Sequence, residues 1–163
     1  MMKKISFLLF LVLILGISTT LSGCKMELSL VGEAEFAKRV ENKGLIITDV
    51  SYTPGEEGVK IKVCAMKEND GYQFEYRRFE DSNMSNTVFE NFTATLENMY
   101  ENKDIKVLKR FSGKNYNSFT ISSNDSEYIV TQIEDELIAM EVTNTDNVSE
   151  AESVYSYVIE GEK

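Results

Sequence analysis

Alternating apolar and polar positions predict strands in the first half of the chain. Every second side chain is apolar over Val59–Met66, and aromatic residues alternate with polar ones over Tyr72–Phe79. Asn69-Asp70-Gly71, between these two runs, is typical of a hairpin turn. Leu45–Tyr52 is an earlier strand-like run, followed by a turn at Thr53-Pro54-Gly55. The pattern therefore predicts three strands, of which the last two form a β-hairpin.

Three other segments have the periodicity of helices. Glu33–Lys43 is a short amphipathic segment that ends just before a glycine. Glu150–Ile159 is predicted to be the last helix, with Ser149 and Glu152 spaced as a capping box. Between residues 82 and 102, apolar residues recur at helical spacing. The predicted buried side of this central helix comprises Val88, Phe89, Phe92, Leu96, Met99 and Tyr100.

Four short strand-like runs follow the central helix and are separated by polar turns. They are Ile105–Phe111, Tyr116–Ser122, Glu127–Ile133 and Glu136–Val142. Short turns favour antiparallel pairing of consecutive strands. The sequence thus predicts an α+β fold: an antiparallel sheet made of a hairpin and then a meander, with a central helix and N- and C-terminal helices packed on it. A ferredoxin-like arrangement is the alternative, because residues 72–111 form a strand–helix–strand crossover.

The first 23 residues have the pattern of a secretory signal. Met1-Met2-Lys3-Lys4 is positively charged, and Ile5–Ile17 is apolar and uncharged. Leu21-Ser22-Gly23-Cys24 then resembles the lipobox of bacterial prolipoproteins at all four positions. The resemblance implies cleavage before Cys24 and a diacylglyceryl group on its sulfur. Whether a further acyl chain such as palmitate joins the new amino group is left open.

The lipobox predicts where the chain is located. Two acyl chains form a stable anchor, so the domain is expected at the extracytoplasmic face of the cell membrane. The expected parts are a signal peptide (1–23), the lipidated Cys24 with a short tether (24–32), and one α+β domain (33–163). The alternative is an uncleaved signal anchor that spans the membrane with Ile5–Gly23, which is near the minimum length for a spanning helix.

Charge narrows the range of partners. The chain has a net charge of −10, and removal of Lys3 and Lys4 with the signal would take it to −12. An acidic domain is repelled by the phosphates of nucleic acids and by anionic lipid in general. We therefore expect no nucleic-acid partner, and an envelope or secreted protein is the expected kind of partner besides the membrane.

The chain contains no histidine, which limits its chemistry. Ser-His-Asp and Cys-His catalysis and histidine metal sites are excluded. If Cys24 carries lipid, Cys64 is the only thiol, and no intramolecular disulfide can form. We expect Cys64 to be a structural residue of a strand, with no redox function. The rival interpretation is that Lys60 and Lys62 lower its pKa and make it reactive.

Two acidic segments could bind calcium, but each is better explained as a turn. Glu68-Asn69-Asp70-Gly71 lacks the alternating oxygen ligands of a calcium loop and matches a hairpin turn. Glu134-Asp135-Glu136 concentrates carboxylates, yet polar turns in an acidic protein commonly carry acids. We therefore predict no metal site and no cofactor.

One basic cluster stands out in this acidic chain. It could face lipid phosphates or a wall polymer, although strand alternation separates its members, so a solvated edge strand that resists aggregation is favoured. The cluster comprises Lys103, Lys106, Lys109, Arg110 and Lys114.

The part after the signal also resembles small uncharacterised lipoproteins of low-GC Gram-positive bacteria. The matching features are the Gly-Tyr-Gln-Phe-Glu-Tyr strand (71–76), the aromatic-striped helix after it, and the strand that begins at Tyr128. This resemblance implies no activity and no site residues. We expect a membrane-anchored binding or accessory module without catalytic residues. The alternatives are a carboxylate-dependent hydrolase at the cell surface and a structural component of an envelope assembly.

Overall fold

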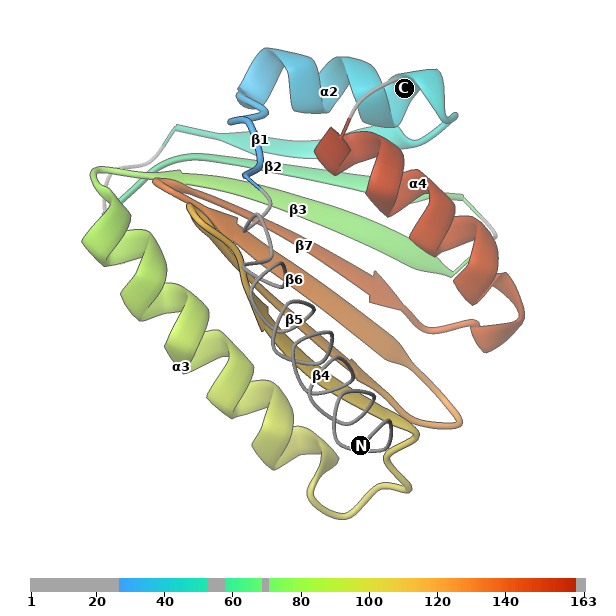
Figure 1. The fold of residues 1–163 in the computed structure, drawn as a ribbon. Helices are drawn as coiled ribbons and strands as arrows, with labels where there is room; N and C mark the ends of the chain where they lie inside the picture. Colours follow the sequence, from blue (N-terminus) through green and yellow to red (C-terminus); the bar gives the residue numbers. More distant parts are fainter. Residues whose placement is uncertain (1–26, 53–57, 69–70, 161–163) are drawn as a thin grey trace, which may run out of the picture.

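Seven antiparallel strands form one sheet with helices on both of its faces (Figure 1). The computed structural model describes residues 27–52, 58–68 and 71–160. The lipobox, the turn at Thr53-Pro54-Gly55, and Asn69 and Asp70 of the predicted hairpin turn lie outside the described residues. In chain order the elements are α2 (Glu33–Asn42), β1 (Ile46–Ser51), β2 (Val59–Lys67), β3 (Tyr72–Phe79), α3 (Ser82–Tyr100), β4 (Val107–Ser112), β5 (Tyr116–Ser122), β6 (Glu127–Ile133), β7 (Glu136–Val142), the 3₁₀ helix η1 (Thr145–Asn147) and α4 (Val148–Glu160).

The chain builds the sheet in two halves that meet at β3 and β7. Strands β1 to β3 pair in succession, and β4 to β7 pair in succession starting from the other edge. Strand β7 then pairs with β3, so the spatial order is β1-β2-β3-β7-β6-β5-β4. The predicted α+β fold, a hairpin followed by a meander, is confirmed. In the ferredoxin-like alternative, the crossover helix would join two strands that lie close together in the sheet. Here α3 joins β3 to β4, and three strands separate these two in the sheet.

Helices α2 and α4 cover one face of the sheet, over β1, β2, β3 and β7 (Figure 1). Tyr72, Phe74 and Tyr76, which alternation places on one face of β3, are all buried there. The ring of Tyr76 stacks on that of Phe36 in α2, with 5.3 Å between ring centres. Gly44 has a φ of 76° directly after the end of α2. It therefore ends the helix in the left-handed conformation that glycine adopts without strain.

Helix α3 covers the opposite face, over β3, β5, β6 and β7. Its buried residues Phe89 and Leu96 pack in one cluster with Phe119, Val130 and Leu137 of the sheet. Strand β7 is therefore covered on both faces. This explains why Leu, Ile, Ala and Met follow one another in β7 without the alternation seen in β2 and β3.

One residue predicted for the buried side of α3 is exposed. The side chain of Met99 is 54% exposed, whereas Thr93, which the apolar pattern leaves out, is fully buried. Thr93 lies four residues after Phe89 and three before Leu96, so it occupies the same side of the helix. The hydroxyl of Thr93 donates to the carbonyl of Glu90 at 3.1 Å, which lets a polar residue occupy this position.

The predicted capping box of the last helix is wrong. Helix α4 begins at Val148, so Ser149 lies inside it. The 3₁₀ helix η1 precedes α4, and the side chain of Asn144 caps η1 by accepting a hydrogen bond from the amide of Asp146 at 3.2 Å. Asn144, four residues before α4, therefore caps the start of this helical segment, and Ser149 does not.

Glu27 and Leu28 lie against the turn between β4 and β5. Asn115 in that turn exchanges two hydrogen bonds with the backbone of Leu28, accepting from its amide at 3.0 Å and donating to its carbonyl at 2.7 Å. The ammonium of Lys114 is 2.7 Å from the carboxylate of Glu27. Part of the predicted tether therefore packs on the domain.

The buried carboxylate of Glu136 holds Val31 and Gly32, the two residues that precede α2. It accepts hydrogen bonds from the amides of Val31 at 2.8 Å and Gly32 at 2.9 Å, and from the hydroxyl of Tyr76 at 2.9 Å. These amides directly precede α2, where an acceptor with negative charge is stabilising. Glu136 at the start of β7 thus joins the N-terminal segment to the centre of the sheet.

Candidate functional site

The sheet face that carries α3 is only partly covered, because α3 contacts β3, β5, β6 and β7 and leaves β1 and the hairpin end of β2 and β3 uncovered. We call the uncovered part the open face. Strand pairing places Ile46, Met66, Gln73, Glu141 and Tyr128 in one cross-strand row of this face. A second row comprises Cys64, Glu75, Ala139 and Val130. Within each row, residues on β1, β2 and β3 are polar or exposed, and the second row becomes buried and apolar where α3 begins to cover it.

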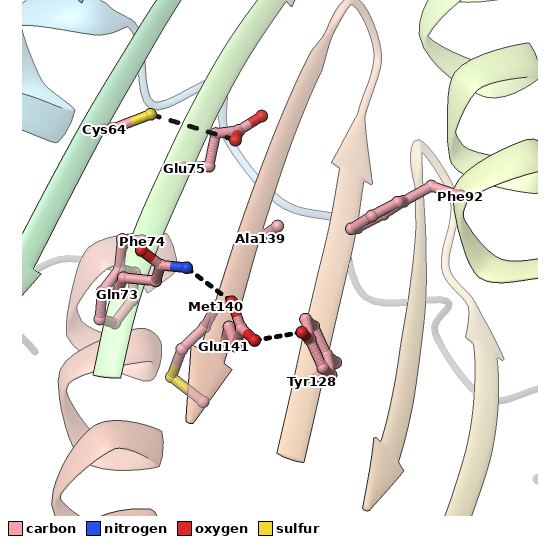
Figure 2. A pocket seen from close by; sticks show the side chains of 9 residues that line it. All are labelled: Cys64, Gln73, Phe74, Glu75, Phe92, Tyr128, Ala139, Met140 and Glu141. Carbon is pink, nitrogen blue, oxygen red and sulfur yellow. Dashed lines mark hydrogen bonds between the residues drawn. The ribbon is translucent and has the colours of Figure 1, made fainter. Parts of the chain in front are cut away.

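A cavity of about 100 Å³ lies on this face where the open face meets α3 (Figure 2). Ala139 lies between the larger lining side chains, because its methyl group leaves space above the sheet. Phe92 of α3 lines one side, and Gln73 and Glu75 of β3 line the other. The other lining residues are Cys64, Phe74, Tyr128, Met140 and Glu141. The cavity has room for one side chain or a few water molecules, and it is too small for a typical cofactor site.

The two carboxylates of the cavity are held by neighbouring side chains. Glu141 accepts hydrogen bonds from Gln73, at 2.5 Å, and from the hydroxyl of Tyr128 (Figure 2). Glu75 pairs with Lys62 at 3.4 Å and also with Arg77. Burial, the hydrogen bond to Glu141 and its negative charge raise the pKa of Tyr128. The phenol is therefore neutral at physiological pH and acts as a donor.

Cys64 has the environment of an unreactive thiol. Its sulfur lies 4.0 Å from Glu75, and partial burial followed by the charge of Glu75 raises the pKa of the thiol. Lys62 acts in the opposite direction, but its ammonium is paired with the same Glu75. The net direction favours the protonated thiol, as expected for a structural cysteine.

A wider hollow of about 400 Å³ continues from the cavity toward the β2–β3 hairpin. Gln73 and Glu141 line both spaces, and Met66 and Thr143 line only the second. Met66 is 41% exposed, and Ile46 beside it on the edge strand β1 is 51% exposed. The open face therefore combines a groove lined by Gln73 and Glu141 with an exposed apolar pair, which makes it a candidate surface for contact with another protein.

One further carboxyl has a strongly shifted pKa. Glu127 at the start of β6 is 5% exposed, and its Oε1 has no hydrogen-bond partner within the described residues. Burial, and then the charge of Glu152 in α4, raise the pKa of Glu127 to about 7, with Lys109 opposing the rise. The sequence provides no signal for this residue, because it is one of many acids and its burial depends on the tertiary structure.

The structure gives the acidic turn between β6 and β7 a structural role. Asp135 pairs with Arg78 at 3.1 Å, and Glu136 holds the segment before α2. The side chain of Glu134 lies 3.4 Å from Asn115. Among residues 27–52, 58–68 and 71–160, no group of three or more Cys, Asp and Glu residues is placed to hold a metal ion.

The basic cluster lies at the β4 edge of the sheet, and β4 is an edge strand, as predicted. Arg110 pairs with Glu90 and Glu97 of α3, and the ammonium of Lys103 lies 4.7 Å from the ring centre of Tyr100. These contacts account for part of the basic charge. The structure brings no member of the cluster to the open face.

Cys24, the predicted lipidation site, lies outside the described residues. Within the described part of the chain, no helix is long and apolar enough to cross a membrane.

Comparison with known proteins shows a similarity in fold to a solved structure. Neither the protein-family models nor the curated proteins searched contain a match to this chain. The crystal structure of a GTP binding regulator from Thermotoga maritima is similar, with a TM-score of 0.52 and 14% sequence identity, and the match covers 80% of this chain and 88% of that one. At this identity the similarity concerns the fold alone.

Proposed function

We propose that this chain is a lipid-anchored module at the extracytoplasmic face of the cell membrane, whose open face binds an envelope or secreted protein. The anchor is proposed from the lipobox and Cys24. Binding is proposed from one observation: α3 leaves part of its sheet face uncovered, and this part carries the groove lined by Gln73 and Glu141 next to exposed Met66.

The position of the groove fits this proposal. Glu136 at the start of β7 holds the N-terminal segment on one face, and Glu141, five residues later, lines the groove on the other. A strand advances about 3.4 Å per residue and alternates its side chains between faces. The groove is therefore about 17 Å along β7 from the point where the chain leads to the anchor.

GTP binding, which is named for the structural neighbour, is not part of the proposal. The cavity of about 100 Å³ is smaller than a typical ligand pocket. Two carboxylates, Glu75 and Glu141, line it and would repel phosphate groups.

Site-specific crosslinking in cells tests the contact. A photoreactive amino acid replaces the exposed Gln73 in the groove, and a matched variant carries it at the exposed Lys38 on α2. We expect a discrete crosslinked species from position 73, reduced when Met66→Glu is added, and none from position 38. Equal crosslinking at both positions, or none at position 73, would contradict binding at the open face.

One observation favours a carboxylate-dependent hydrolase as the second candidate. Glu127 has a pKa of about 7, which is suited to general acid–base work. The measurement that decides is turnover of hydrolase substrates by the wild type and by Glu127→Gln. If the wild type turns over a substrate and Glu127→Gln does not, the hydrolase is established. If Glu127→Gln leaves turnover unchanged, the hydrolase that uses Glu127 is excluded.

A further inference from the structure

The N-terminal segment fixes which edge of the sheet lies nearest to the anchor. Glu27 is bound to Lys114 and Leu28 to Asn115, so the chain leaves the domain at the β4–β5 turn. Cys24 precedes Glu27 by three residues, which span at most about 10 Å. A lipid on Cys24 therefore holds this turn, and the edge strand β4 beside it, close to the bilayer.

Strand β4 has the side chains of a membrane-contacting edge. Phe111 is 56% exposed and Leu108 is 52% exposed, although both are apolar. Lys106 and Lys109 are also exposed, and neither forms an ion pair with another described residue, although the charge of Lys109 acts on the pKa of Glu127. Lys109 and Phe111 lie on the same face of β4 because they are two residues apart. Long basic side chains next to apolar ones suit the lipid headgroup region, where the stem packs and the ammonium meets phosphate.

We propose that the β4 edge lies on the bilayer surface, with Phe111 in the headgroup region and Lys106 and Lys109 at anionic lipid phosphates. The inference rests on the proposed lipid anchor, and it adds the orientation of the domain. The open face, whose groove lies at the far end of β7, then remains accessible to a protein partner. The net negative charge of the rest of the chain favours this single orientation, because anionic lipid repels the other surfaces.

The chain lacks tryptophan, so single tryptophans can report the orientation. Phe111→Trp places the probe on β4, and Tyr52→Trp places it after β1 at the opposite edge, where Tyr52 is 63% exposed. The full chain is expressed in a bacterium, and mass spectrometry verifies that Cys24 carries lipid. The protein is then reconstituted in vesicles that contain phosphatidylglycerol and doxyl-labelled lipid, which quenches tryptophan fluorescence. We expect quenching of Phe111→Trp to exceed that of Tyr52→Trp by at least about twofold.

Each outcome separates the orientation from the anchor. Equal quenching of the two probes in lipidated protein would overturn the orientation and leave the anchor intact, with β4 free for a protein partner instead. Absence of lipid on Cys24 would overturn both. The double substitution Lys106→Glu and Lys109→Glu should reduce the difference between the probes. The control, Lys38→Glu on α2 together with Lys43→Glu directly after it, should not. If the difference between the probes is unchanged in the Lys106→Glu and Lys109→Glu variant, the proposed role of these lysines is overturned.

Discussion

At Cys64, burial and two opposite charges determine the reactivity of a single thiol. Burial and Glu75 raise its pKa, and Lys62, paired to Glu75, only partly opposes them. In a Cys24→Ala background, where Cys64 is the only thiol, we predict alkylation at neutral pH at least about tenfold slower in the native protein than in the unfolded chain. Glu75→Gln should accelerate it. Native labelling at the rate of the unfolded chain would support the interpretation that Cys64 is reactive.

Glu127 should make the stability of the protein depend on pH. The pKa of this carboxyl is raised to about 7 in the folded state, so its ionisation favours unfolding. The stabilising contribution is complete below the ordinary pKa of 4.5 and is lost as the pH rises through 7. We predict that the free energy of unfolding falls by about 2–3 kcal/mol between pH 5 and pH 8 because of this residue.

Urea denaturation at the two pH values, for the wild type and Glu127→Gln, measures this effect. The substitution should remove most of the difference and stabilise the protein at pH 8. Glu101→Gln, at the exposed end of α3, is the matched control and should change neither value. An unchanged pH dependence in Glu127→Gln would mean that another group causes it.

At the scale of elements, α3 shows which residues of a helix a periodic pattern can place. Leu96 is 1% exposed and Met99 is 54% exposed, although both are apolar and three residues apart. We predict that Leu96→Ala lowers the free energy of unfolding by about 2–5 kcal/mol, because it leaves a cavity against the sheet. Met99→Ala should change it by less than about 0.5 kcal/mol. Thermal or urea denaturation of the two variants compares them, and similar losses would contradict the observed orientation of α3.

The strands and helices were predictable because local pattern determines them. Alternation over Val59–Met66 and Tyr72–Phe79 identifies β2 and β3 within a residue or two, and Gly44 ends α2 as predicted. The cap of the last helical segment was missed, since Asn144 acts through η1, an element that periodicity does not reveal. Thr93 was missed because a buried hydroxyl satisfied by the helix backbone looks polar in sequence.

The candidate site was not predictable for a different reason. Gln73, Glu141 and Tyr128 come from three strands, and the pairing of β3 with β7 that joins them connects residues far apart in the sequence. The same holds for Glu136, which appears in sequence as one acid of a polar turn and in the structure holds the amides of Val31 and Gly32. Strand order, which no local pattern determines, creates both.

For the whole molecule, the contacts of residues 27–32 connect the proposed anchor to the proposed binding surface. The chain is bound to the domain at Lys114, Asn115 and Glu136, and it is three residues from Cys24 at Glu27. A module held this closely to its lipid has a defined orientation, in contrast to one on a long flexible linker. The groove on the open face, at the other end of β7, lies away from the β4–β5 turn that holds Glu27 and Leu28.

The mass of the N-terminal peptide from the membrane fraction tests the central claim most directly. We predict a peptide that begins at Cys24 and carries a diacylglyceryl group, with or without an acyl chain on its amino group, and we predict that Cys24→Ala accumulates as unprocessed precursor. Cys64→Ala, which changes the other cysteine, should be processed normally. An intact peptide that runs through Gly23-Cys24, or an unmodified Cys24 at the mature N-terminus, would contradict the account.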